Sequence, residues 1–303
     1  MTDADEHAAA LRPLLIALAY RMVGSFTEAE DLVQEALLRL HRAQAEGTEI
    51  ASTRAFLTTV TTRLAIDHLR SARVRREAYL GPWFPEPLVD ELAPDVAGHA
   101  EMSDSLSMAF LLLLETLSPA ERAVFLLHEV FEYQYGEIAQ ILDKSETNCR
   151  QIMVRARRRI DEGKPRFAAS RAERDKLAER FLASCQDGDL DALIDLLSAD
   201  VTFSGDGGGK AVAFTDPIVG RRRVTRLLIG LVGKLLAHGG VVRLVHLGGS
   251  PGLMLYDNRQ RLLAVWSLDI AGGQVQTIRG VVNPDKLAHL GPVSDLGLKR
   301  ATR

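Results

Sequence analysis

The segment YGEIAQILDKSETNCRQIMVRARRRI, residues 135–160, decides the fold of the middle of this chain. Apolar residues recur at helical spacing on both sides of Asp143-Lys144-Ser145, which predicts two helices joined by a tight turn. Ser145 is a suitable N-cap for the second helix. That helix carries, opposite its apolar stripe, side chains suited to base edges and phosphates: Thr147, Asn148, Arg150, Gln151, Arg155 and Arg158. We interpret the segment as a DNA-binding helix-turn-helix, with a solvated helical hairpin as the alternative.

The net charge of the 303 residues is only −3, but the charge is unevenly distributed. Residues 51–80 hold six basic and two acidic side chains, and residues 144–166 hold eight basic and three acidic ones. Residues 81–121, between them, hold eight acidic side chains and no basic one. Because phosphates respond to charge within a Debye length, two basic islands of this kind favour nucleic-acid binding.

The composition narrows the class of protein. The chain is 47% hydrophobic, has two cysteines and begins with an acidic stretch, MTDADEHAAALRP. It contains no apolar run of 18 residues, so we expect a cytoplasmic protein without a membrane segment. Two cysteines are too few for a disulfide framework or a zinc cage, and we predict no metal and no cofactor.

Three helices are predicted in the N-terminal part, over residues 8–24, 28–43 and 52–79. Thr27 is the expected cap of the second helix, whose polar face carries Asp31, Gln34, Glu35 and Arg39. The third helix holds more arginines than its dipole explains, which favours a phosphate-tracking face: Arg54, Arg63, Arg70, Arg73, Arg75 and Arg76.

A proline-rich linker follows over residues 81–98, with Trp83 and Phe84 between prolines, and we expect these aromatics to dock on another surface. A helix at about 103–116 is expected next. Ser118 then provides an N-cap for another helix, with Pro119 at its first position and Glu121 at its third.

The C-terminal part has helices first and strands afterwards. Helices are predicted over residues 172–185, 189–197 and 221–236, and strands over 241–247, 253–256, 262–270 and 275–282. This order is typical of an α+β domain, here with a curved antiparallel sheet.

The motif Asp31-Leu32-Val33-Gln34-Glu35, the arginine-rich helix and the helix-turn-helix, in this order, resemble an extracytoplasmic-function sigma factor of bacterial RNA polymerase. The resemblance implies that Asp31, Gln34, Glu35 and Arg39 bind core polymerase. It implies that the basic helix binds the −10 promoter element and opens the duplex, through Arg63, Asp67, Arg70, Arg73, Arg75 and Arg76. The second helix of the helix-turn-helix would read the −35 element, with Asn148, Arg150 and Gln151 on bases and Arg155 and Arg158 on phosphates. Two residues depart from the family pattern, Asp143 at a turn position where glycine is common and Cys149 in place of a branched aliphatic residue.

The C-terminal part resembles a SnoaL-like cone fold, which one branch of these sigma factors carries and uses for regulation within the same chain. Three motifs carry this resemblance: Trp83-Phe84-Pro85-Glu86-Pro87, Asp206-Gly207-Gly208-Gly209-Lys210 and Asn283-Pro284-Asp285-Lys286. We therefore expect a multidomain protein, with two all-α sigma domains followed by an α+β SnoaL-like domain. The expected bounds are region 2 at 1–80, an acidic linker at 81–105, region 4 at 106–164 and the SnoaL-like domain at 172–303.

The loop Asp206–Lys210 has two functional interpretations besides a flexible hairpin tip. Asp206 and Lys210 could make charged contacts with Glu86 or the acidic 81–121 segment, or the loop could form a phosphate nest. An enzymatic alternative would place His246, Asp269 and Arg279 around a cavity as acid–base groups.

The prediction is a transcription initiation factor with no catalytic residues, whose partners are core polymerase and promoter DNA. A small-molecule-sensing regulator, or a SnoaL-like enzyme fused to a DNA-binding module, is the alternative function. We expect a monomer when free, while self-association through the C-terminal domain stays open.

Overall fold

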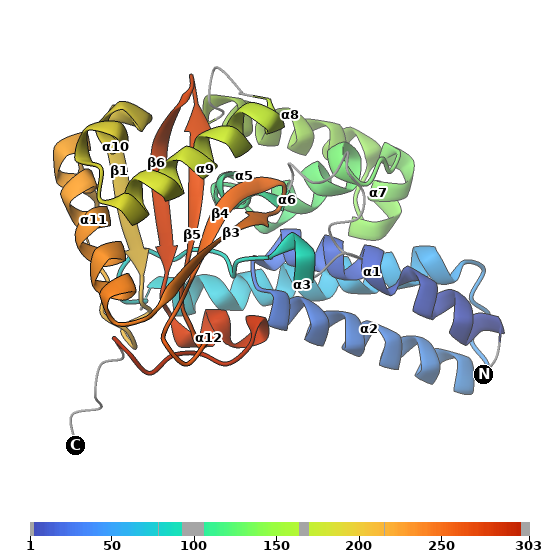
Figure 1. Cartoon of the computed structure of the whole chain (residues 1–303). Coiled ribbons are helices and arrows are strands. Elements are labelled where there is room, and N and C mark those ends of the chain that lie inside the picture. The colour runs from blue at the N-terminus through green and yellow to red at the C-terminus, as the bar shows by residue number, and fades with distance from the viewer. Residues whose placement is uncertain (1–2, 78, 93–105, 164–169, 215, 298–303) are drawn as a thin grey trace. The chain divides into compact units, whose positions relative to one another are not determined.

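The computed structural model describes residues 3–77, 79–92, 106–163, 170–214 and 216–297 (Figure 1). The side chains of residues 3–7, 72–77 and 163 are not among those described. The chain divides into two compact units. Unit 1 comprises residues 1–77, 94–105 and 110–164, and unit 2 comprises residues 78–93, 106–109 and 165–303.

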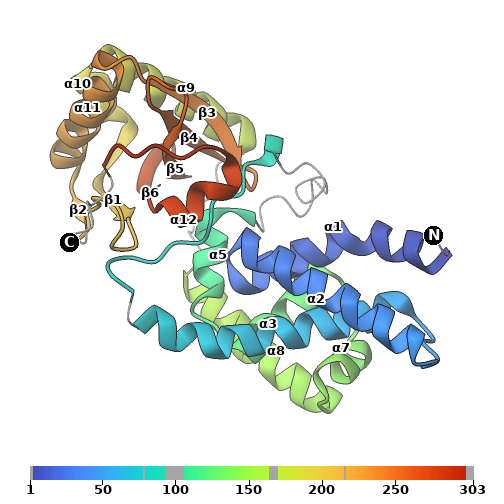
Figure 2. The same ribbon diagram turned by 90° about the horizontal axis from the view of Figure 1, so that it is seen from below.

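The first helical part of unit 1 consists of α1 (Asp3–Val23), α2 (Phe26–Ala45) and α3 (Thr53–Glu77), which pack side by side (Figure 2). The apolar stripe of α2 is buried at Ala29, Val33, Ala36 and Leu40, as its periodicity predicts. The cap of α2 is Ser25 rather than Thr27, because the Ser25 hydroxyl accepts the Glu28 N–H at 3.1 Å.

The second helical part contains α5 (Met108–Leu114), α6 (Pro119–Phe125), the π-helical turn η3 (Leu126–Val130), α7 (Tyr135–Leu142) and α8 (Glu146–Gly163). The helix expected over 103–116 is shorter, and its first residues fall outside those described. The capping box of Ser118 and Glu121 is confirmed, with Pro119 in the first turn.

Unit 2 begins with the short turn η1 (Asp90–Leu92) and continues with α9 (Arg171–Asp187) and α10 (Leu190–Leu196). A six-stranded sheet follows, with α11 (Arg221–Ala237) inserted in its sequence and α12 (Pro284–Leu287) and η4 (Ala288–Leu290) after it. The strands are β1 (Leu197–Asp206), β2 (Ile218–Val219), β3 (Val241–Leu247), β4 (Ser250–Tyr256), β5 (Leu262–Ala271) and β6 (Gln274–Val281).

The sheet is mixed, in the order β2-β1-β6-β5-β4-β3. All neighbouring strands pair antiparallel, as expected, except β1 and β6, which pair parallel. Tight hairpins impose antiparallel pairing on β3 to β6, but β1 and β6 are joined through α11 and four further strands, so no turn fixes their direction.

The core of unit 2 lies between one face of the sheet and the helices α9, α10 and α11. Strand β5 contributes Ala264, Trp266, Leu268 and Ile270 to this core. Trp266 packs closely on β6, where a Cβ at Gly280 would lie 3.1 Å from its indole ring. Among the helices that the structure describes, none is long and apolar enough to cross a bilayer.

Candidate nucleic-acid interface and linker clasp

The helix-turn-helix has the geometry that its sequence predicts. Asp143 ends α7 in the left-handed conformation with φ 52°, so this position accepts a residue other than glycine. Ser145 accepts the Asn148 N–H at 3.2 Å, which confirms it as a cap of α8. Cys149 is fully buried in the apolar stripe of α8, where burial raises the pKa of its thiol. The buried Cys149 thiol therefore takes the place of the branched side chain within the packed core of this domain.

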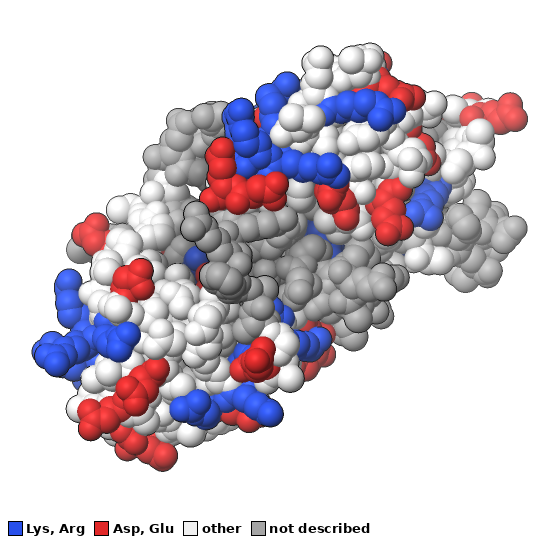
Figure 3. All heavy atoms as spheres, turned by 90° about the horizontal axis from the view of Figure 1, so that it is seen from above, with Lys and Arg blue, Asp and Glu red and all other residues white. Residues whose placement is uncertain are grey.

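The six side chains predicted for the −35 element are all exposed on α8. Basic side chains gather over this helix with acidic ones beside them (Figure 3). Arg150 pairs with Glu146 at 3.1 Å and lies over the Tyr135 ring, 4.6 Å from its centroid. Both members of that pair are more than half exposed, so DNA can compete for the guanidinium.

Arg155 differs from its neighbours because it faces a buried carboxylate. Glu121 is 5% exposed and lies 3.6 Å from Arg155 and 2.6 Å from Arg159. Burial alone would raise the pKa of Glu121, but the hydrogen bonds from Ser118 and the two guanidinium groups outweigh it and lower that pKa. Arg155 therefore stabilises the charge on α6 as well as adding to the basic surface.

The polymerase-facing residues predicted from the D-L-V-Q-E motif share one side of α2. Asp31 and Gln34 are exposed, and Glu35 pairs with Arg39 at 2.8 Å. Leu38, which is not among the residues predicted from the motif, lies among them with 45% of its surface exposed.

The residues predicted for the −10 element have different surroundings along α3. Asp67 and Arg70 form an exposed pair at 3.0 Å, each with 70% of its side chain accessible. Arg63 instead donates to the carbonyl oxygens of Ile141 at 2.9 Å and Gln140 at 3.5 Å, at the C-terminal end of α7. The side chains of Arg73, Arg75 and Arg76 lie outside the described ones.

Further contacts join the two helical parts of unit 1, and no local sequence pattern predicts them. Arg122 of α6 donates to the carbonyl of Met22 at 2.6 Å. Tyr133 Oη lies 3.0 Å from the Thr58 hydroxyl of α3. Arg21 is completely buried with its guanidinium 5.5 Å from the Phe131 ring, and burial lowers its pKa to about 10. The two parts therefore form a single packed unit.

A buried polar cluster in unit 2 brings the three C-terminal motifs together, and we call it the linker clasp. Its centre is Asp206, which is fully buried at the end of β1. The Asp206 carboxylate accepts hydrogen bonds from Tyr79 Oη at 2.5 Å, Phe84 N at 2.8 Å and Lys286 Nζ at 2.7 Å. Asn283 completes the clasp, with its Nδ2 donating to Tyr79 Oη at 2.9 Å.

Lys286 connects the clasp to the aromatic residues of the linker. Its ammonium group donates to the carbonyl of Phe84 at 2.5 Å and lies 4.3 Å from the Trp83 ring centroid and 4.8 Å from that of Tyr79. Burial, followed by the hydrogen bond to Asp206, raises the pKa of Tyr79 far above its ordinary range, so the phenol stays protonated as a donor. The expectation that the linker aromatics dock is thus confirmed, and Phe84 is 6% exposed.

The glycine run is needed because the clasp leaves no room for side chains. A Cβ at Gly207 would lie 2.5 Å from the Ala211 carbonyl oxygen, and one at Gly208 would lie 2.3 Å from Asn283 Nδ2. The loop is therefore neither a flexible tip nor an open phosphate nest. Lys210 pairs with Asp285 at 2.5 Å, not with Glu86, whose carboxylate lies 3.8 Å from His289 Nδ1.

The rest of the linker also packs on unit 2. Residues 84–89, including Pro85 and Pro87, are buried, and Val89 forms a bridge to Leu247 at the end of β3. The Asp90 carboxylate accepts the N–H groups of Gly248 at 2.7 Å and Gly249 at 2.9 Å. Residues 79–92 therefore belong structurally to the C-terminal unit, although they precede region 4 in the sequence.

The acid–base set considered for an enzyme does not line the apolar pocket of this unit. Asp269 is bonded to Arg279, while His246 lies 3.1 Å from Asp175 and 3.5 Å from Glu91. Among the described residues that line the pocket, none is titratable. These three residues therefore do not form an acid–base set around this pocket.

Comparison with known proteins agrees with this architecture. Residues 8–75 match the family Sigma-70 region 2, and residues 107–160 match Sigma-70, region 4. The molecule is therefore of the sigma-70 class, with a further domain at its C-terminal end. The chain belongs to the ECF RNA polymerase sigma factors. It is an alternative sigma factor that binds core RNA polymerase and directs transcription initiation from promoters with −10 and −35 elements.

Its relatives include sigma factors with the same extension. The chain is 36% identical over 289 residues to the ECF RNA polymerase sigma factor SigJ of Mycobacterium tuberculosis, covering 91% of each chain. It is 34% identical over 280 residues to the probable ECF sigma factor SigI of that organism, covering 91% of this chain and 92% of the relative. The crystal structure of M. tuberculosis SigJ has a TM-score of 0.74 and 32% identity, covering 96% of this chain and all of the other. The resemblance to the branch of these sigma factors that carries a C-terminal extension is confirmed.

Proposed function

We propose that this sigma factor uses three helical surfaces in initiation. The exposed face of α2, with Asp31, Gln34, Glu35, Leu38 and Arg39, contacts core polymerase. The basic face of α3 contacts the −10 element, and the exposed face of α8 contacts the −35 element. The exposure of the predicted side chains on α2 and α8 supports the assignment, because each can reach an external partner without unfolding its domain. The protein acts in the cytoplasm, where polymerase and promoter DNA meet, and it has no catalytic activity of its own.

The C-terminal unit regulates initiation from within the same chain, through its hold on the linker between regions 2 and 4. The observation that carries this proposal is the complete burial of Asp206 between Tyr79, Phe84 and Lys286. A linker fixed at both Asp206 and Asp90 has few conformations, so the clasp limits how the two DNA-binding parts can separate.

The test is run-off transcription by core polymerase with the full-length chain on a promoter library. We expect promoter-specific initiation, and we expect the double variant Trp83→Ala, Phe84→Ala to change its yield. Lys210→Ala is the matched control, because Lys210 belongs to the same loop but forms only an exposed pair. Equal yields from the double variant and the control, with both proteins folded, would contradict regulation through the clasp.

The packed form of unit 1 is a resting form in this proposal. Arg63 donates its Nε–H to the Ile141 carbonyl, so the contact between α3 and α7 must open before the whole guanidinium group can turn to promoter phosphates. Tyr133→Phe removes the hydroxyl shared with Thr58 and leaves every predicted DNA contact intact. Promoter complexes should form faster with this variant, whereas unchanged rates would mean that the contact does not limit binding.

A further inference from the structure

Unit 2 contains an apolar pocket of about 270 Å³ on the side of the sheet that α11 covers. Phe203 and Trp266 form one wall, in an edge-to-face pair with ring centroids 5.6 Å apart. Leu231 of α11, Leu255 of β4 and Val282 contribute other walls. None of the described lining residues carries a charge, and the only hydroxyl among them belongs to Ser294.

Small residues create this space, because large ones at the same positions would fill it. Gly205, Ala264 and Gly280 line the pocket directly beneath the aromatic pair. The hydroxyl of Ser294 is already used, since it donates to the Asp257 carboxylate at 2.8 Å. A cavity lined in this way offers water almost no hydrogen bonds and favours an apolar occupant.

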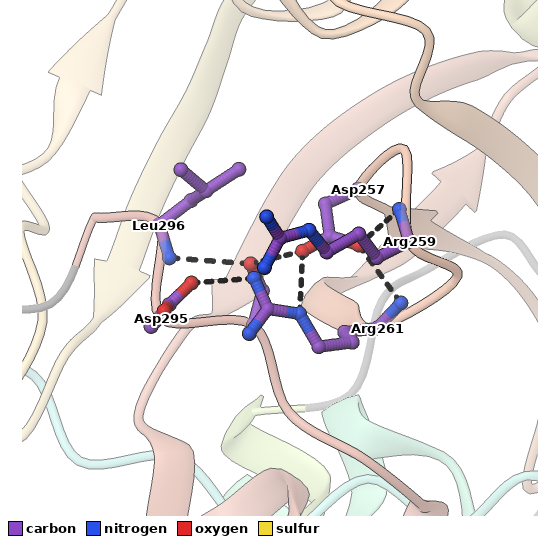
Figure 4. A network of polar contacts seen from close by, with 6 residues as sticks. Asp257, Arg259, Arg261, Asp295 and Leu296 are labelled. Carbon is purple, nitrogen blue, oxygen red and sulfur yellow. Dashed lines mark hydrogen bonds and ion pairs between the residues drawn. The ribbon is translucent and has the colours of Figure 1, made fainter.

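The mouth of the pocket is held in place by a network on the C-terminal segment (Figure 4). The Asp257 carboxylate accepts the backbone N–H groups of Arg259 and Arg261, both at 2.9 Å, and Arg261 also bonds Asp295 at 2.5 Å. These contacts fix residues 292–297, and Gly297 then accepts the Val212 N–H at 2.9 Å. A polar groove with Lys234, Arg259 and Arg261 along it adjoins the pocket, and Leu231 and Leu296 line both.

One wall of the pocket is continuous with the linker clasp. Residues 211–214 line the pocket and follow the clasp loop, residues 206–210, directly in sequence. Ala213 also lies under that loop, 2.9 Å from the place that a Cβ of Gly207 would occupy. An occupant that displaces Ala213 therefore presses on the loop that holds the linker.

We propose that this pocket is the binding site for a small, uncharged, apolar molecule, of the size and character of a compound with two or three hydrocarbon rings. Its volume lies just below the range of drug-sized ligand sites, about 300–1,000 Å³, which excludes a large ligand. Its lining excludes an ionic ligand, because no described side chain in it can compensate a buried charge.

The test uses N-phenyl-1-naphthylamine, an uncharged fluorescent probe, with the full-length chain. We expect saturable binding of one probe per chain, with a blue-shifted emission. In a Trp83→Phe background, Trp266 is the only tryptophan of the chain, and it should transfer excitation energy to the bound probe.

Two lysine substitutions on α11 locate the site. Leu231→Lys places an ammonium group on the pocket wall and should weaken binding at least about tenfold. Leu227→Lys, one turn earlier and equally half-buried outside the pocket, should leave binding within about twofold of the parent chain. Leu296→Lys, at a mouth residue that is already 54% exposed, is a second pocket variant that does not disturb the core. The absence of saturable binding, equal binding by the Leu231 and Leu227 variants, or the absence of energy transfer would overturn the proposal.

Discussion

The recognition helix α8 and the linker clasp both depend on charged side chains, but they hold them in opposite environments. Arg150 and Glu146 of α8 keep 60% and 53% of their side chains exposed. Lys286 and Asp206 of the clasp keep 9% and 0%. The first pair is open to exchange with a phosphate or a base, whereas the second is sealed by the linker that it holds.

This difference fixes what each region can do. An exposed ion pair contributes only about 0–1 kcal/mol, so Arg150 can leave Glu146 for DNA at small cost. Removing one partner of a buried pair costs about 3–5 kcal/mol, because the other charge is left without compensation. The helix is thus suited to reversible recognition, and the clasp to a contact that changes only when the linker moves.

The largest effect is expected from breaking the clasp. Lys286→Met leaves the buried Asp206 carboxylate without its cation, and we expect it to lower the stability of unit 2 by about 3–5 kcal/mol. Urea unfolding of the full-length chain at neutral pH measures this loss. Asp206→Asn in the Lys286→Met background removes the orphaned charge and should restore part of the stability. A loss below about 1 kcal/mol for the single variant would mean that the clasp behaves like a surface pair.

A second buried carboxylate gives a prediction that depends on pH. Burial alone would raise the pKa of Asp257, but the Arg261 N–H, the Ser294 hydroxyl, the Arg259 N–H and the Arg261 guanidinium outweigh it and lower that pKa from 3.8 to about 2. Since the pKa is lower in the folded state, the contribution of Asp257 is complete above pH 3.8 and is lost as the pH falls through about 2.

We therefore expect Asp257→Asn to be less stable than the parent chain by about 2 kcal/mol at pH 6. That difference should shrink steadily between pH 4 and pH 2. Urea midpoints at a series of pH values measure it, and a difference that does not depend on pH would contradict the assignment.

The distance in sequence between interacting residues explains which features the sequence predicts. The helix-turn-helix and the Ser118 capping box depend on residues within a few positions of one another, and both are confirmed. The three motifs of the clasp are recognisable as family features, and the docking of the linker aromatics follows from their apolar character. Which charges pair there is not predictable, because Asp206 and Lys286 lie 80 residues apart, and the sequence offered Glu86 or the acidic 81–121 segment as partners instead.

Other features have no local signal at all. The parallel pairing of β1 with β6 depends on a long connection. Arg21 lies in an apolar helix with nothing to indicate a buried ring contact. Arg63 has the same basic character as its neighbours on α3, and only the packing of α7 distinguishes it. Long-range packing thus decides which of several similar side chains is engaged in a contact within the protein.

On α8, we expect a moderate effect on recognition. Arg150→Ala should reduce discrimination between −35 sequences by about 1–2 kcal/mol, the lower part of the range for a bidentate base contact. The reduction is limited because Arg150 must leave both Glu146 and the Tyr135 ring when it binds. Competition binding with single-base variants of the promoter measures it. Arg158→Ala is the control, since an arginine on phosphates should weaken all sequences equally, and the same uniform loss for Arg150→Ala would assign that residue to phosphate as well.

The smallest effect is expected at the exposed pair beside the clasp. This pair tests whether burial or position in the loop decides how much unfolding free energy a substitution removes. Lys210 lies in the same glycine-rich loop as Asp206 and pairs with Asp285, which neighbours Lys286. The side chains of Lys210 and Asp285 are 57% and 60% exposed, however. If burial decides, Lys210→Met should cost less than about 1 kcal/mol in urea unfolding, and this small loss should largely disappear in 1 M salt. If the loop itself is sensitive, Lys210→Met would cost as much as Lys286→Met, and the opposition between a sealed clasp and an exposed surface would fail.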